Sequence, residues 1–143
     1  MSSIIIDTNI MTLYDAPIDP SYSKLFKWLE KEGTLCISDF LSMEYMGTGN
    51  RNIVLLLARL SKNADKNRLI KIQKEVIKSF KDDKRFKYTS NRKDWNHARL
   101  TFLSPRKKMI TQDVKLTNDI NKFKKIQGIK PTAIDKPIET YYK

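Results

Sequence analysis

The sequence predicts an α/β fold in which helices flank a central parallel sheet of four to five short strands. Three observations carry this prediction: isoleucines fill positions 4–6, short apolar segments alternate with longer amphipathic ones, and an acid follows both the first and the last apolar segment. A β-branched run of this kind is typical of a strand covered on both faces, as in a parallel sheet. A chain of 143 residues is enough for one core, so we expect a single domain over 1–143.

The first half of the chain is expected to alternate strands with helices. "SIII" at the start and "TLCIS" over 34–38 are the predicted strands. The predicted helices are "SYSKLFKWLEKEG" over 21–33, "DFLSMEYMG" over 39–47 and "NIVLLLARLSK" over 52–62. Each has apolar residues three and four positions apart, and Gly33 is the expected stop of the first.

The second half is expected to hold three more helices and two strands. The apolar spacing predicts helices over 64–80, 92–103 and 113–128. The predicted strands are "RFKYTS" over 85–90, at the sheet edge, and "GIKPTAID" over 128–135. Proline suits only an edge or the start of a strand, which places Pro131 near the beginning of the last one.

The charge balance predicts a polyanionic partner. The 28 Lys and Arg outnumber the 16 Asp and Glu, which leaves a formal charge of +12. Nucleic acid is the first candidate partner and an anionic membrane surface the second. The sequence has no long apolar stretch and no signal peptide, and its single Cys36 suits a reducing compartment, so we expect a cytoplasmic protein with no membrane span. His97 has no second His or Cys with which to form a zinc site.

Acids stand at several positions where a ligand site would form. Asp7 and Asp135 end the first and last predicted strands, and ligands of open α/β sheets bind at the carboxyl ends of strands. Glu44 falls on the apolar stripe of its helix, where a carboxylate is costly unless it is paired or binds a metal. Asp113 opens a helix, and Asp119 lies six residues further on. Helix capping for Asp7 and Asp113, and a place at the edge of the stripe for Glu44, are the structural alternatives.

Carboxylates that converge without a His or Cys cluster suit a hard cation, Mg²⁺ or Mn²⁺. In a strongly basic protein, such a site fits the hydrolysis of a phosphodiester by a metal-activated water, with Lys and Arg side chains holding the nucleic-acid backbone.

The same segments resemble the motifs of PIN-domain ribonucleases, in particular the VapC-type toxin branch. "IIIDTNIM" is similar to the opening motif of the family, and "ISDFLSMEYMG" is similar to the second, with Glu44 seven residues after Ile37. "ITQDVKL" resembles the third motif and "GIKPTAID" the last, so the resemblance covers essentially the whole chain. It implies a PIN-like architecture.

The resemblance also implies the site. Its catalytic, metal-binding acids would be Asp7, Glu44, Asp113 and Asp135. Thr8 and Asn9 would position the first of these acids.

Two departures from the family pattern leave alternatives open. Ala133 stands two residues before the last acid, where the family usually has Thr or Ser, with Thr132 next to it. The predicted helix over 113–128 is about a turn longer than usual, so Asp119 is an alternative third acid and Asp94 a weaker substitute.

The residues and this resemblance together predict an Mg²⁺- or Mn²⁺-dependent endoribonuclease, and the resemblance implies that it is the toxin of a type II toxin-antitoxin pair. RNA, a cognate antitoxin and a second copy of the chain are the partners that this prediction implies. The alternative is a non-catalytic RNA-binding or assembly module with the same fold. A magnesium-binding receiver domain is a third possibility, but it normally needs adjacent acids after the first strand, and this chain has only Asp7 there.

Overall fold

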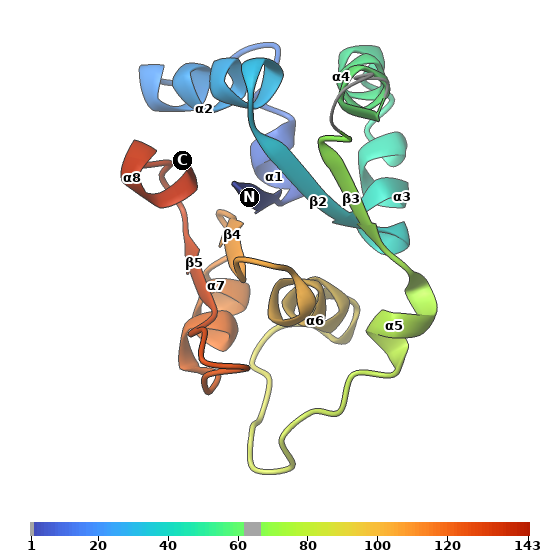
Figure 1. Cartoon of the computed structure of the whole chain (residues 1–143), viewed down its shortest axis with the longest axis vertical. Helices are drawn as coiled ribbons and strands as arrows, with labels where there is room; N and C mark the ends of the chain where they lie inside the picture. The colour runs from blue at the N-terminus through green and yellow to red at the C-terminus, as the bar shows by residue number, and fades with distance from the viewer. Residues whose placement is uncertain (1, 62–66) are drawn as a thin grey trace.

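A computed structural model describes residues 2–61 and 67–143 and shows one central sheet of five strands. All neighbouring strands are parallel, in the order β3-β2-β1-β4-β5. The strands are β1 (Ser3–Ile6), β2 (Thr34–Ser38), β3 (Leu69–Ile72), β4 (Lys108–Ile110) and β5 (Thr132–Ile134). Figure 1 shows helices on both sides of this sheet, which confirms the predicted α/β class and is consistent with a PIN-like architecture.

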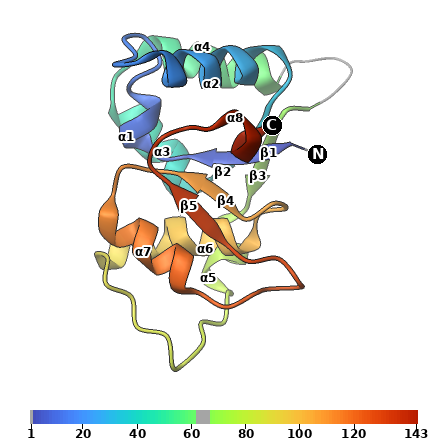
Figure 2. The same ribbon diagram turned by 90° about the vertical axis from the view of Figure 1, so that its left-hand side faces the viewer.

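The helices form the two outer layers. In Figures 1 and 2, α2 and α4 lie on one side of the sheet, and α6 and α7 lie on the other. The α-helices are α1 (Thr8–Met11), α2 (Pro20–Lys31), α3 (Asp39–Gly47), α4 (Arg51–Ser61), α5 (Lys74–Lys78), α6 (Trp95–Leu103), α7 (Val114–Lys122) and α8 (Glu139–Tyr142). A 3₁₀ turn, η1 (Arg92–Asp94), leads directly into α6. None of the helices in the described ranges is long and apolar enough to span a membrane.

The central strand β1 explains the isoleucine run. All four of its residues are buried, because β1 pairs with β2 on one side and β4 on the other and has a helical layer over each face. The backbone N–H of Asp7 continues this ladder and donates to the carbonyl oxygen of Ile110 at 2.9 Å. Since β1 and β4 are parallel neighbours, the residues that follow them meet at the same edge of the sheet.

The prediction of one helix over 64–80 is wrong. Residues 69–72 form β3, which pairs with β2 from Leu35↔Leu69 to Ser38↔Ile72, and among the described residues 67–80 only 74–78 are helical. The apolar spacing of "LIKI" is compatible with a helix or a strand, and the open edge of β2 decides in favour of the strand. Residues 62–66, which include the end of the expected helix over 52–62 and the start of this one, lie outside the described residues.

The segment over 85–90 forms no strand, contrary to the prediction. Its aromatic side chains pack instead of pairing in a sheet: Phe86 meets Phe123 edge-on at 5.0 Å between ring centroids, and Tyr88 stacks on Trp95 at 4.8 Å. The strand that pairs with β1 on this side is β4, which has only three residues and too little pattern to be recognised from the sequence.

The last predicted helix is shorter than expected. It ends at Lys122, because Phe123 adopts an extended conformation and stacks on Phe102 with a centroid distance of 4.0 Å. A turn with positive φ at Gln127 and Gly128 then returns the chain to the sheet. β5 begins directly after Pro131, which agrees with the expected place of the proline.

Candidate metal centre

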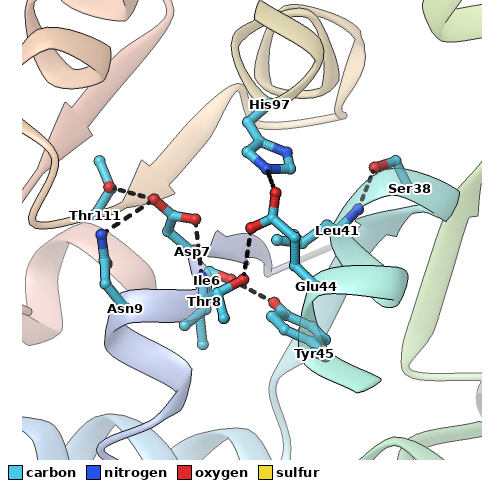
Figure 3. A network of polar contacts seen from close by, with 10 residues as sticks. All are labelled: Ile6, Asp7, Thr8, Asn9, Ser38, Leu41, Glu44, Tyr45, His97 and Thr111. Atoms are coloured by element: carbon cyan, nitrogen blue, oxygen red, sulfur yellow. Dashed lines mark hydrogen bonds and ion pairs between the residues drawn. The ribbon is translucent and has the colours of Figure 1, made fainter. Parts of the chain in front are cut away.

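Asp7 is held at the end of β1 by three neighbours (Figure 3). Its side chain is almost buried, with 6% of the residue exposed. Oδ1 accepts the backbone N–H of Thr8 at 2.8 Å, and Oδ2 accepts the hydroxyl of Thr111 at 2.6 Å and the amide of Asn9 at 3.3 Å. Asp7 therefore caps α1, as the structural alternative proposed, and is also fixed by the residue that follows β4.

Glu44 reaches the same place from α3. Ser38 caps this helix by accepting the N–H of Leu41 at 3.1 Å, which sets the direction of α3 from the end of β2. Glu44 Oε1 then accepts the hydroxyl of Thr8 at 2.9 Å. With 39% of its side chain exposed, Glu44 lies at the solvent side of the cluster, while its neighbour Tyr45 is buried beneath and donates to the carbonyl of Ile6.

His97 completes the cluster from α6. Its Nε2 lies 2.6 Å from Glu44 Oε2, and the residue is only 1% exposed. Its other nitrogen, Nδ1, is buried with no hydrogen-bond partner in the described part of the chain, so Nε2 is the atom through which the ring meets the site. The sequence predicts no ligand role for His97, since no second His or Cys accompanies it, but the packing of α6 near α3 brings it to Glu44, 53 positions earlier.

Asp7, Glu44 and His97 form a group that could hold a metal ion. One ligand atom from each lies within 4.8 Å of the other two. Two carboxylate oxygens and one imidazole nitrogen suit Mn²⁺ or a similar divalent transition ion. Mg²⁺ prefers oxygen ligands and would rely on the two carboxylates and on water.

The charges of Asp7, Glu44 and His97 shift one another's pKa values. Burial raises the pKa of Asp7, and the hydrogen bond from Thr111 and the charge of His97 only partly oppose this shift. Burial also acts to raise the pKa of Glu44, but the contacts with His97 and Thr8 outweigh it and lower the pKa. For His97 burial favours the neutral ring, yet the bond to Glu44 and its charge raise the pKa. A bound cation would favour the ionised form of both acids.

Asp94 and Asp113 adjoin the group. Burial is the largest cause of the raised pKa of Asp94, followed by the charge of Asp113, and the charges of Asp7 and Glu44 act in the same direction. Asp113 caps α7 by accepting the N–H of Leu116 at 3.0 Å. Its own N–H donates to Thr111 Oγ1 at 3.1 Å, and Thr111 is the residue that holds Asp7. Asp113 is therefore linked to Asp7 through Thr111, and Asp94 lies within electrostatic reach of both.

The other two candidate acids lie elsewhere. Asp119 is buried, and its carboxylate accepts the backbone N–H and hydroxyl groups of Thr89 and Ser90 at 2.6–2.9 Å, so it anchors the chain before η1. Asp135 is exposed after the edge strand β5, in an open hollow of about 330 Å³ that Gln112 and Val114 also line. Neither belongs to the group around Asp7. The structure therefore brings Asp7 and Glu44 together through Thr8, links Asp113 to Asp7 through Thr111, and leaves Asp135 outside the group.

Comparisons with protein-family models, curated proteins and solved structures found no match to this chain. What the site can do chemically therefore follows from its own residues.

Proposed function

We propose that the protein is a divalent-metal-dependent endoribonuclease. One observation carries the proposal: Asp7, Glu44 and His97 offer ligand atoms within 4.8 Å of one another, at the edge of a parallel sheet where such enzymes bind ligands. Asp94 and Asp113 add carboxylates beside them. The net charge of +12 would attract the polyanion that a metal centre of this kind cleaves.

The residues divide into ligands, positioning groups and a base. A divalent ion bound to Asp7, Glu44 and His97 would supply the positive charge that activates water and stabilises the transition state of phosphodiester hydrolysis. Thr8 and Thr111 orient the two carboxylates through hydrogen bonds of 2.9 and 2.6 Å. Asp94, whose carboxylate is close enough to Asp7 and Glu44 for their charges to raise its pKa together with burial, would be the base that accepts a proton from the attacking water.

RNA as the substrate, and a role as a toxin with a cognate antitoxin and a homodimeric state, rest on the resemblance to VapC-type PIN-domain ribonucleases. A cytoplasmic location is part of the same proposal. The positive charge supports any nucleic acid as a partner and does not itself choose RNA.

One observation favours the second candidate, a non-catalytic RNA-binding module. Both oxygens of Glu44 already have partners, Thr8 and His97, and both oxygens of Asp7 are hydrogen-bonded. A cluster closed in this way can be stable without a metal. If the ring of His97 serves only to neutralise the charge of Glu44, the protein keeps its fold but binds no metal and does not cleave RNA.

Cleavage of total cellular RNA by the purified protein distinguishes the two candidates. We expect discrete products with Mn²⁺, none with chelator, and none with Asp7→Asn. Asp83→Asn is the matched control, because Asp83 is a carboxylate of the chain between α5 and η1, paired with Lys124 and outside the cluster. RNA binding without cleavage in any metal would favour the non-catalytic module.

A further inference from the structure

A pair of stacked aromatic rings lies at the start of α6, the helix that carries His97. The rings of Tyr88 and Trp95, called here the aromatic platform, have centroids 4.8 Å apart and planes inclined by 20°. Both side chains are partly exposed. Trp95 directly follows Asp94 in the chain and begins α6, two residues before His97. Side chains two positions apart on a helix do not share a face, so Trp95 and His97 lie on different faces of α6, and Asp94 links the platform to the site along the chain.

The platform is fixed in place by polar contacts on both rings. The indole N–H of Trp95 donates to the carbonyl of Ser90 at 3.1 Å, and Asp119 in turn holds Ser90. The hydroxyl of Tyr88 donates to Asp82 at 2.6 Å, and Arg99 pairs with the same carboxylate at 2.5 Å. A ring that is already held in one orientation loses little conformational entropy when a ligand stacks on it.

Positive charge surrounds the platform. The guanidinium of Arg92 lies 6.0 Å from the ring centre of Trp95, and that of Arg99 lies 5.8 Å from both ring centres. Lys93 is near enough to Glu44 for its charge to act on that carboxylate. Arg99 is engaged with Asp82, whereas Arg92 and Lys93 form no ion pair with any acid within 2–61 and 67–143. These two cations are available for an anion that the chain itself does not supply.

We propose that the aromatic platform stacks on an unpaired RNA base, while Arg92 and Lys93 contact the phosphates next to that base. Every nucleobase has a π face, so aromatic rings beside cations bind single strands with little sequence preference. Bases inside a duplex are not accessible to such rings, and the enzyme therefore selects loops, bulges and ends. Cleavage of the bound strand rests on the proposed function, but RNA binding by the platform does not.

Tryptophan fluorescence gives a direct test, because the chain has only two tryptophans. Trp28 is buried, with 6% exposed, against Tyr142, while Trp95 is partly exposed. The protein is titrated in chelator with a short oligouridylate and with a blunt RNA duplex, and fluorescence anisotropy of labelled RNA gives binding independently. We expect the single strand to quench the emission of Trp95 and the duplex to leave it unchanged. The quenching should disappear in Trp95→Phe and persist in Trp28→Phe.

Affinity supplies the second readout. Trp95→Ala should weaken binding of the oligouridylate roughly tenfold or more, the scale of one lost base–aromatic stack, while Trp95→Phe keeps most of the affinity because a ring remains. If Trp95→Ala does not fold, the wild-type protein and Trp95→Phe still decide the question. Binding without quenching, or equal quenching by the duplex, would overturn the platform and leave the nuclease proposal standing. Quenching without any cleavage would support the platform and reject the nuclease.

Discussion

Thr111 is the residue whose removal tests most sharply how Asp7 is held. In Thr111→Val the shape is retained, but Asp7 Oδ2 loses a donor at 2.6 Å and the N–H of Asp113 loses its acceptor at 3.1 Å. A hydrogen bond to a charged group contributes about 1.5–3 kcal/mol and a neutral one about 1 kcal/mol. Because Asp7 is 6% exposed, solvent does not replace the lost donor. We expect the free energy of unfolding to fall by about 2–4 kcal/mol.

Urea unfolding followed by circular dichroism, in chelator, measures this loss. Thr101→Val is the matched control: Thr101 is equally buried, and its hydroxyl donates at 2.9 Å to the neutral carbonyl of His97, so the expected loss is about 1 kcal/mol. Burial already raises the pKa of Asp7 above 3.8, and the loss of Thr111 raises it further. The difference between wild type and Thr111→Val should therefore shrink as the pH falls toward 3.8 and Asp7 is protonated in both. A loss no larger than that of Thr101→Val would refute the assigned role of Thr111.

Three further predictions concern the acids and His97. His97→Gln can still donate a hydrogen bond to Glu44 but offers no ring nitrogen, so calorimetry should show Mn²⁺ affinity falling roughly tenfold or more and Mg²⁺ affinity changing less; an equal change for both metals would exclude His97 as a ligand. Asp113→Asn should weaken Mn²⁺ binding and Asp135→Asn should not. If Asp135→Asn weakened binding and Asp113→Asn did not, Asp135 would be the metal ligand instead. Asp119→Asn should cost about 1.5–3 kcal/mol in thermal or urea unfolding. Burial acts to raise the pKa of Asp119, but the hydrogen bonds from Ser90 and Thr89 outweigh it and lower the pKa below 3.8. The unfolding free energies of wild type and variant should therefore become equal as the pH falls below 3.8 and Asp119 is protonated. A difference that does not change with pH would show that the charge of Asp119 is not involved.

The sequence is sufficient for the elements that carry their own pattern. The isoleucine run before Asp7 predicts a buried central strand that ends on an acid, and the structure has this strand between β2 and β4. The place of Glu44 on the apolar stripe of its helix likewise predicts that it faces inward, and its side chain meets Thr8 at the start of α1.

The remaining parts depend on contacts between distant segments. The segment "LIKI" has a spacing that fits helix or strand, and only the vacant edge of β2 makes it β3. His97 lacks a neighbouring motif, and it joins the site because α6 packs near α3. Asp119 has the residue type expected of a ligand, yet it anchors Thr89 and Ser90, in a segment whose irregular path no periodicity describes.

The central claim is that Asp7, Glu44 and His97 bind a divalent ion, and a Mn²⁺-dependent thermal shift tests it most directly. At a Mn²⁺ concentration one hundred times the dissociation constant, the folded state should gain about 2.7 kcal/mol and the melting temperature should rise by several degrees. Glu44→Gln should abolish this shift, and Asp83→Asn should retain it. A wild-type protein that melts at the same temperature with Mn²⁺, with Mg²⁺ and with chelator would contradict the account.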